Sequence, residues 1–304
     1  MSFGAARAGD GPVLLIGASG QVGRRLSEAL RGRCSLIALT RDDLDLRDDA
    51  RIRATVRQYA PSVVINSAAY TRVDDAERER EACWAINAIA PGILAAEAAR
   101  TGALSIDFST NYVFAGDGDS AYREQDDVHP LSEYGRSKAE GERRIATENP
   151  RHLIIRTHGI YDQHGINFLR RILALAHERE ELRVVHDQIG APTPAVLIAG
   201  AVADLLDRAS HEGWNDEDCG ILHLTTSGEA SWYDFAARAL ALDPQRAGQR
   251  CTALHAIASS EFVTPACRPL NGRLDTHRAR AHFGLSLPSW DAALEEVLQH
   301  WETA

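Results

Sequence analysis

A short apolar strand that leads directly into a glycine turn and then a helix is the feature that most restricts the fold. Residues 13–16 are all apolar, a GxxGxxG turn occupies residues 17–23, and apolar residues then recur at helical spacing to residue 30. Glycines let the backbone turn tightly and approach a pyrophosphate, whose negative charge the helix N-terminus attracts. This order predicts a dinucleotide site, with a purely structural turn as the alternative. The predicted contacts are Gly17, Gly20, Gln21 and Val22.

Strands and helices continue to alternate beyond this first unit. Further strands are expected at 35–39, 62–66, 103–108 and 151–156, with helices at 52–59 and 82–100. This alternation predicts an α/β fold with a doubly wound parallel sheet. A helix at 195–206 and a strand at 220–225 are assigned to the same sheet.

The remaining segments predict a smaller lobe over the carboxyl edge of that sheet. Its expected elements are a helix at 167–179, a strand at 182–185, a Gly/Pro loop at 187–193, and helices at 231–240 and 290–299. The predicted dinucleotide-binding domain thus covers 1–157 plus about 195–227. The predicted substrate-binding lobe covers about 158–194 plus 228–304.

Residues after the second and third strands complete the predicted cofactor site. Arg41 follows the second strand, where an NAD-specific site usually carries an acidic residue, so it favours the 2'-phosphate of NADPH. Asp42 and Asp43 follow at once, which leaves NADH possible and an ordinary surface charge as the alternative reading of Arg41. The other expected cofactor contacts include Asp45 and Leu46, which would flank the adenine. Ala68, Ala69 and Thr71 follow the third strand, where small residues would let the cofactor lie close against the backbone.

Tyr134 and Lys138 stand four residues apart, which places both side chains on one face of a helix. A free tyrosine has a pKa of about 10, and a lysine held beside it favours the phenolate and allows proton exchange near pH 7. A solvated helix face is the alternative. Ser109 and Thr110 follow the apolar run 103–108, at the carboxyl end of a predicted parallel strand, where open sheets bind ligands. We therefore expect the three hydroxyl groups to converge.

Composition restricts the class of partner. The 304 residues include 44% hydrophobic and 25% charged residues, and the net charge of −10 argues against nucleic acid or an anionic membrane. A small solute is the expected partner. No apolar run is expected to reach the length of a membrane span, and residues 1–12 lack a signal-peptide core, so we expect a cytoplasmic protein. Five scattered cysteines without a CxxC are expected to be free thiols.

Several sequence blocks together resemble the extended short-chain dehydrogenase/reductases, which are Rossmann-like, and within them the dTDP-4-dehydrorhamnose reductase family. The blocks include GASGQVG at 17–23, NSAAYTRVDDAE at 66–77, STNYVF at 109–114, YGRSKAEGE at 134–142 and RPLNGRLDT at 268–276. The resemblance implies that NAD(P)H reduces the C4 keto group of a nucleotide-linked 4-keto-6-deoxy sugar, here dTDP-4-dehydro-L-rhamnose. It implies that Tyr134 protonates the C4 oxygen, that Thr110 hydrogen-bonds it, and that Lys138 tunes Tyr134 and holds the nicotinamide ribose.

The same resemblance assigns residues to the substrate. Asn167, Phe168 and Arg268 are expected near the diphosphate or nucleotide, and Gln188 near the sugar. The alternatives are that Phe168 packs in a core and that Asn167 caps the helix after it. Asn87 is expected to be a buried helix residue that bonds the backbone.

Three departures from the family pattern qualify these roles. Asn111 stands where the family usually has Asp, which turns a carboxylate into a neutral amide. His158 and Gly159 replace a usual Ser-Trp pair, which predicts a wider pocket, with His158 either a partner for a sugar hydroxyl or a packed residue. Val196 stands where some dimeric members carry a magnesium-binding Glu, so we expect no metal and a monomer or weak homodimer.

Two other functions stay open at this point. The altered pocket is compatible with a different nucleotide 4-ketosugar. A non-catalytic NADP-binding subunit, like the regulatory beta subunit of methionine adenosyltransferase, is the alternative from another class. The intact set of Thr110, Tyr134 and Lys138 favours the enzyme, because a regulatory role makes no chemical demand for all three.

Overall fold

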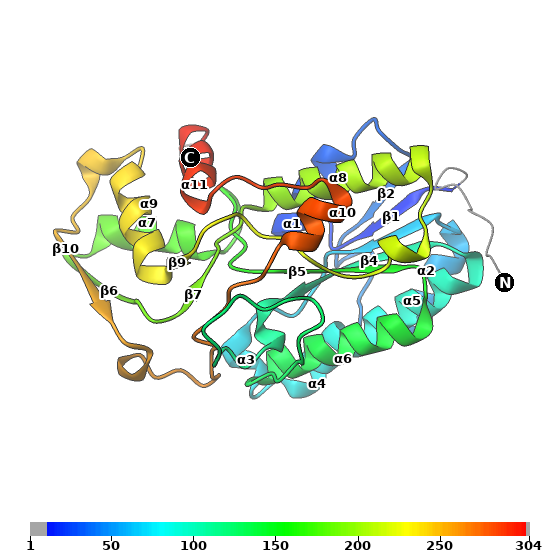
Figure 1. Cartoon of the computed structure of the whole chain (residues 1–304), viewed down its shortest axis with the longest axis horizontal. Coiled ribbons are helices and arrows are strands. Elements are labelled where there is room, and N and C mark those ends of the chain that lie inside the picture. The colour runs from blue at the N-terminus through cyan, green and yellow to red at the C-terminus, as the bar shows by residue number, and fades with distance from the viewer. Residues whose placement is uncertain (1–10, 302–304) are drawn as a thin grey trace.

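The structure, a computed structural model, describes residues 11–301, so the expectation about a signal peptide at residues 1–10 lies outside it. Within the described range, six parallel strands form the main sheet in the order β2-β1-β3-β4-β5-β8 (Figure 1). The doubly wound parallel sheet is confirmed, and each strand lies within two residues of its predicted bounds. The strands are β1 (Val13–Ile16), β2 (Leu36–Leu39), β3 (Val63–Asn66), β4 (Leu104–Thr110), β5 (His152–Thr157) and β8 (Gly220–His223).

The order of strands reverses between β1 and β3. The chain moves outward from β1 to β2, crosses back, and continues through β3, β4 and β5 on the other side of β1. In an open parallel sheet, ligands bind beyond the carboxyl ends of the strands at such a switch point. Gly17 follows β1 and Ser67 follows β3 at this point, so the topology brings the glycine turn to the expected place.

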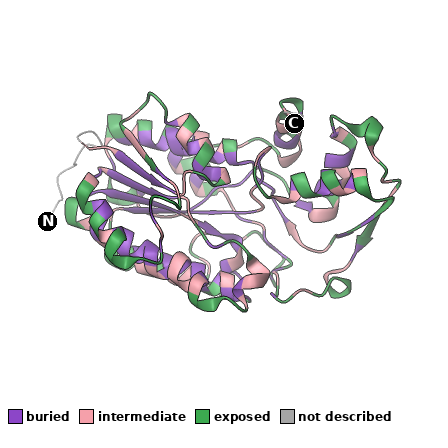
Figure 2. Cartoon of the chain, turned by 180° about the vertical axis from the view of Figure 1, so that it is seen from behind, coloured by how far each residue is buried: buried purple, intermediate pink, exposed green. Residues whose placement is uncertain are grey.

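Helices cover both faces of this sheet. On one face α1 packs against α8, and on the other α2, α5 and α6 pack side by side (Figure 1). Strands β1 and β3 are fully apolar or nearly so, and all their residues are buried, because both sides of the sheet are covered (Figure 2). The helices are α1 (Gln21–Ala29), α2 (Asp49–Tyr59), α5 (Ala90–Thr101), α6 (Glu133–Glu148) and α8 (Ala195–Glu212).

The expected long helix is one helical run from Arg80 to Thr101, formed by α4 (Arg80–Trp84), a π-helical segment (Ala85–Ile89) and α5. By length and composition it is apolar enough to cross a membrane, so the prediction that no run reaches that length is wrong. Its most apolar window is 61% buried inside the protein. The helix lies between α2, α6 and the sheet, and a helix with protein on several sides is apolar all round.

The smaller lobe is built on α7, α9 and α11 with two short sheets (Figure 1). Strand β6 pairs parallel with β10, and β7 pairs antiparallel with β9. Its core includes Tyr161, Leu169, Phe235 and Leu294, all at most 1% exposed. Its elements are α7 (Phe168–Glu178), β6 (Glu181–Val185), β7 (Ile189–Gly190), β9 (Ala230–Ser231), α9 (Trp232–Leu242), β10 (Ala253–Ile257) and α11 (Trp290–Gln299).

One helix departs from the predicted division of the chain. Helix α10 (His277–Phe283) packs with the main sheet, because Ala279 and Phe283 belong to the core around α1 and α8. The range 228–304 therefore mixes lobe residues with this helix, and the remaining bounds stay a prediction. The other short elements are α3 (Val73–Ala76) and 3-10 turns at 111–113, 216–218, 246–248 and 259–261.

Candidate active site at the carboxyl edge of the sheet

The turn after β1 requires glycine at two positions. A Cβ atom on Gly17 would lie 2.6 Å from the Ala68 nitrogen, and one on Gly23 would lie 2.1 Å from the Gly17 oxygen. Helix α1 then begins after Gly20 with no side-chain cap, so among the described residues its first N–H groups are left for an anion. Gln21 and Val22 form the first turn of α1. This cradle fits the pyrophosphate of a dinucleotide.

Arg41 lies just beyond β2 and is exposed. Within the described part of the chain it makes no hydrogen bond or ion pair, whereas the nearby Arg47 is held by Asp45 at 2.5–3.1 Å. Because of that partner, the pKa of Asp45 falls to about 2. Among the described residues Arg41 is thus a cation without a hydrogen-bonded partner at this end of the sheet, as a site for a 2'-phosphate requires. Leu46 is 6% exposed and packs in the core under α2, which leaves only its backbone for the adenine.

The end of β3 lies against the glycine turn. Ala68 is half-buried and contacts Gly17 closely, while Ala69 and Thr71 are exposed. Asn87, in the π-helical segment, holds this loop by accepting from the Tyr70 N–H at 2.8 Å and donating to the Tyr70 carbonyl at 3.0 Å. The prediction that Asn87 is buried and bonds the backbone is confirmed.

The predicted acid-base residues meet where β4 ends and α6 begins. The Ser132 side chain caps α6 by accepting from the Gly135 N–H, which sets Tyr134 in the first helical turn and Lys138 one turn later. The side chain of Thr110, the last residue of β4, hydrogen-bonds the Tyr134 phenol. The structure therefore brings Thr110 and Tyr134 together at the carboxyl edge.

The charge state of Tyr134 differs from the expectation. Burial raises the pKa of the phenol well above its ordinary value, and the hydrogen bond from Thr110 opposes that rise only in part. The Lys138 ammonium lies 3.5 Å from a carboxylate oxygen of Asp107 on β4, and both side chains are buried. Burial also raises the pKa of Asp107, although Lys138 and Asn66 oppose that rise, and the Tyr134 phenol keeps its proton because its own pKa is raised.

Ser109 does not join the other two hydroxyl groups. Its Oγ donates to a Glu142 carboxylate oxygen at 2.5 Å, and Arg156 holds the same carboxylate at 2.6 and 2.9 Å. The hydroxyl group of Ser109 is therefore taken by Glu142, two turns further along α6 than Tyr134. The expected convergence of three hydroxyl groups is wrong for Ser109.

Two departures from the family pattern, Asn111 and His158, lie together at Gly272. A Cβ atom on Gly272 would lie 2.5 Å from Asn111 Nδ2 and 3.1 Å from His158 Nδ1. Both side chains are buried, and His158 Nδ1 has no hydrogen-bond partner among the described residues. Burial lowers the pKa of His158 to about 4, so its imidazole is neutral at physiological pH.

The wider pocket expected at Gly159 is absent, because other residues fill the space. A Cβ atom there would lie 3.2 Å from Pro192 Cα and 3.3 Å from Trp232 Cη2, and Gly159 has a φ of +54°. The Trp232 ring lies 5.8 Å from the His158 ring and 4.6 Å from the Phe168 ring, measured between centroids. An aromatic surface therefore stands at this place but comes from α9.

The substrate residues expected on α7 have structural partners. Asn167 caps α7 by accepting from the Arg170 N–H at 3.0 Å, so the capping alternative is confirmed. Its amide also donates to Gln21 Oε1 at 3.0 Å, which joins the lobe to the cofactor turn. Phe168 packs on Trp232, in agreement with the packing alternative. Substrate contact by either residue stays a prediction.

Gln188 and Arg268 are also engaged within the protein. Gln188 Nε2 donates to Ser259 Oγ at 2.9 Å. Arg268 donates to both carboxylate oxygens of Asp74 at 3.0 and 2.8 Å, so its charge is already matched in this structure. Contact of Arg268 with a diphosphate would require exchange of that partner, and the role stays a prediction.

Sequence reasoning missed Asp107, Trp232 and Gly272. Asp107 is the one charged residue in the run 103–108, and a carboxylate in a buried strand signals a partner. Trp232 and Gly272 carry no such signal, since only tertiary packing brings them to His158.

The structure offers no metal site among the residues it describes, because no three or more His, Cys, Asp or Glu side chains gather there. Val196 is 46% exposed at the start of α8. The five cysteines are free thiols, as predicted.

A doubly wound sheet with a glycine cradle at its switch point, and with Thr, Tyr and Lys at the adjacent strand end, defines an extended short-chain dehydrogenase/reductase. The family model described as "RmlD substrate binding domain" matches residues 11–303. The dTDP-4-dehydrorhamnose reductase of Salmonella typhimurium is 38% identical over 293 residues, covering 94% of this chain and 96% of the relative. The chain therefore belongs to the dTDP-4-dehydrorhamnose reductase family.

Solved structures of relatives superpose over nearly the whole chain. The structure of a dTDP-4-dehydrorhamnose reductase from Clostridium acetobutylicum superposes with a TM-score of 0.88 at 34% identity. The match covers 96% of this chain and 100% of the Clostridium chain. That of dTDP-4-dehydrorhamnose reductase from Bacillus anthracis in complex with NADP has a TM-score of 0.87 at 31% identity, covering 96% and 99%.

Proposed function

We propose that this protein uses NADPH to reduce the C4 keto group of a nucleotide-linked 4-keto-6-deoxy sugar, namely dTDP-4-dehydro-L-rhamnose to dTDP-L-rhamnose. The observation that carries the proposal is the pairing of Thr110 and Tyr134 at the strand end next to the glycine cradle. Reduction of a ketone places alkoxide charge on oxygen, and donors fixed at that point stabilise the transition state more than the ground state. The relatives with that printed name support the substrate.

The proposed roles follow from the positions of the side chains. Thr110 Oγ1 and the Tyr134 phenol orient the keto oxygen, and Tyr134 gives up its proton as charge develops there. When bound, NADPH supplies the hydride. Lys138 holds the ribose hydroxyls next to Tyr134, and the α1 N-terminus holds the pyrophosphate. Arg41 holds the 2'-phosphate, which favours NADPH while NADH stays possible.

The lobe residues form the proposed sugar and nucleotide site. Asn111 and His158 provide neutral polar groups where the family pattern has a carboxylate and a serine. His158 Nδ1, which has no partner in the described part of the chain, is a candidate contact for a sugar hydroxyl. This change favours a different 4-ketosugar as the second candidate substrate. The other proposed contacts are Gly159, Asn167, Phe168, Gln188 and Arg268. We further propose a cytoplasmic monomer or weak homodimer without magnesium.

The direct test is the loss of NADPH absorbance with dTDP-4-dehydrorhamnose, with NMR identification of the product. Formation of dTDP-L-rhamnose is the expected result. Turnover only with another nucleotide 4-ketosugar would redirect the assignment to that sugar. Binding of NADPH without turnover of any of them would refute the enzyme and support the regulatory alternative.

A further inference from the structure

The turn that follows β2 is closed by an acidic side chain, Asp43. One oxygen of its carboxylate accepts hydrogen bonds from the Thr40 backbone N–H at 2.9 Å and from the Thr40 hydroxyl group at 2.8 Å. The N–H groups of Asp43 and Leu44 donate in return to the Thr40 carbonyl oxygen at 3.2 and 3.1 Å. The two bonds from Thr40, the backbone bond first, lower the pKa of the Asp43 carboxyl below its ordinary value, so Asp43 is ionised at neutral pH.

This turn lies beside the glycine turn of the proposed cofactor site. Leu39, the last residue of β2, accepts hydrogen bonds from the N–H groups of Gly17 at 2.9 Å and Ala18 at 3.0 Å. Thr40 and Arg41 follow directly. Near the end of the second strand, dinucleotide-binding folds contact the adenosine ribose, with an Arg for a 2'-phosphate or an acidic residue for a 2'-hydroxyl group. The turn therefore stands where NADPH and NADH differ.

Thr40 carries two donors of the kind that bind phosphate. Phosphate oxygens accept hydrogen bonds from backbone N–H and hydroxyl groups, and an Arg beside them adds a charge-assisted bond. In this structure both Thr40 donors are occupied by the Asp43 carboxylate, while the adjacent Arg41 is exposed. A carboxylate thus holds the groups that a 2'-phosphate would use next to Arg41.

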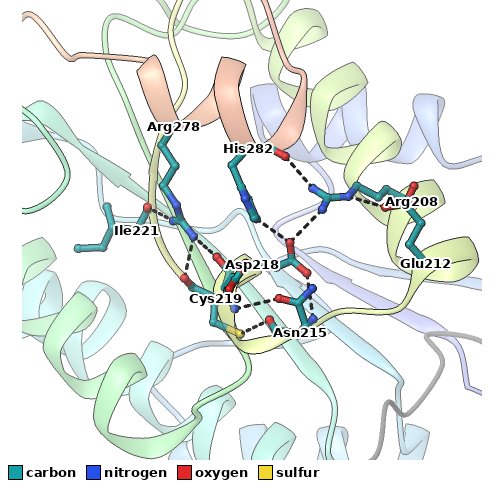
Figure 3. A network of polar contacts seen from close by, with 9 residues as sticks. Arg208, Glu212, Asn215, Asp218, Cys219, Ile221, Arg278 and His282 are labelled. Atoms are coloured by element: carbon teal, nitrogen blue, oxygen red, sulfur yellow. Dashed lines mark hydrogen bonds and ion pairs between the residues drawn. The ribbon is translucent and has the colours of Figure 1, made fainter.

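The negative charge of Asp43 has no cation beside it within residues 11–301. Asp218 shows the contrast, because it closes a turn in the same way by accepting from the Asn215 N–H at 2.9 Å. The Asp218 carboxylate also pairs with Arg208 at 3.3 Å and His282 at 2.8 Å (Figure 3). Asp43 has no such pair, so its charge repels a phosphate dianion brought to the same turn.

We propose that Asp43 is a specificity-determining residue that sets the choice between NADPH and NADH. Its carboxylate takes the place of the 2'-phosphate on Thr40, so NADPH must displace it, whereas NADH leaves it in position. Arg41 favours NADPH and Asp43 opposes it, and the two together give a site that accepts both cofactors. The inference rests on the proposed cofactor site and deepens it by assigning the cofactor preference to one side chain.

Asp43→Ala should tighten the binding of NADPH about three- to tenfold and change that of NADH by less than about twofold. Loss of a unit charge at about 6 Å from a phosphate dianion in water changes its affinity about tenfold at low salt, and screening reduces that effect. The freed Thr40 donors add to the gain. Asp43→Asn should give a smaller gain, because the amide oxygen still accepts from Thr40 although the charge is gone.

The measurement is a fluorescence titration of the protein with NADPH and with NADH, without a sugar substrate, at low and high salt. Asp42→Ala is the matched control, because Asp42 is the exposed neighbour with the same charge and makes no hydrogen bond to Thr40 in the described structure. It should change the ratio of the two dissociation constants by less than about twofold. Equal effects of Asp42→Ala and Asp43→Ala would overturn the proposal, because they would show that Thr40 plays no part.

Thr40→Val tests whether the effect acts through Thr40, since valine keeps the shape of the side chain without the hydroxyl group. In that background the NADPH gain from Asp43→Ala should shrink by about twofold or more. An unchanged NADPH-to-NADH ratio in Asp43→Ala would overturn the proposal, as would weaker binding of NADH, which would mean that Asp43 holds the ribose hydroxyl group. The titration needs no ketosugar, so absence of turnover would count against the proposed reduction alone.

Discussion

Gly190→Ala is expected to destabilise the protein through a collision with His158. A Cβ atom on Gly190 would lie 2.2 Å from His158 Nε2 and 2.4 Å from Cδ2, far inside van der Waals contact. Gly190 cannot retreat easily because β7 pairs with β9, and the imidazole is confined between Gly272 and Trp232. Overpacking of this kind costs about 1–3 kcal/mol.

A double-mutant cycle isolates this contact. In a His158→Ala background the added methyl group occupies vacated space, so the cost of Gly190→Ala should fall below about 0.5 kcal/mol and give a coupling energy of about 1–2 kcal/mol. The assay is urea unfolding of the four proteins. Costs that simply add would show that the His158 ring does not rest on Gly190, and would refute the packing described for this pocket.

Gly200→Ala provides the control for the added methyl group. Gly200 lies within α8, and a Cβ atom there meets nothing within 4 Å. Alanine favours a helix over glycine by about 0.5–1 kcal/mol, so this variant should be slightly more stable than the original protein. Replacing glycine by alanine should therefore lower the free energy of unfolding at position 190 and raise it at position 200.

Three further predictions concern the site. Tyr134→Phe should lower turnover about 100- to 10,000-fold with nearly unchanged NADPH binding, and unaltered turnover would remove Tyr134 from the mechanism. Arg41→Ala should weaken the binding of NADPH about three- to tenfold more than that of NADH in a binding titration. Equal weakening of both would show that Arg41 does not contact the 2'-phosphate. Gly159→Trp should cost more than about 1 kcal/mol in urea unfolding, because its φ is +54° and its surroundings are filled; an unchanged midpoint would contradict this.

The sequence was sufficient for features that depend on local order. An apolar strand followed by glycines predicts a turn independently of the rest of the chain. Strand β1, its turn and α1 could therefore be predicted from residues 13–30 alone. The position of Thr110 followed from one further rule, that carboxyl ends of parallel strands share the edge where ligands bind, and its pairing with Tyr134 on α6 from the family resemblance.

Features that depend on packing between distant segments could not be predicted in this way. Ser109 has the same hydroxyl group as Thr110, and only the approach of α6 and β5 shows that Glu142 takes it. Gly159 indicated empty space, but α9 brings Trp232 into that space from far along the chain. Arg268 looked free to meet a diphosphate until the fold set it against Asp74.

The contact between the lobe and the dinucleotide-binding part follows from the same kind of long-range packing. Gln21, the first residue of α1, accepts a hydrogen bond from Asn167 at the start of α7. One turn along α1, Arg25 donates to both oxygens of the buried Asp162 at 2.6 and 3.0 Å. A partly buried, bidentate pair of this kind is costly to break, because separation leaves Asp162 without its cation. Helix α1 therefore holds the glycine turn and the start of α7 in one fixed relation, which the proposed meeting of a hydride donor and a bulky nucleotide-sugar at Tyr134 requires.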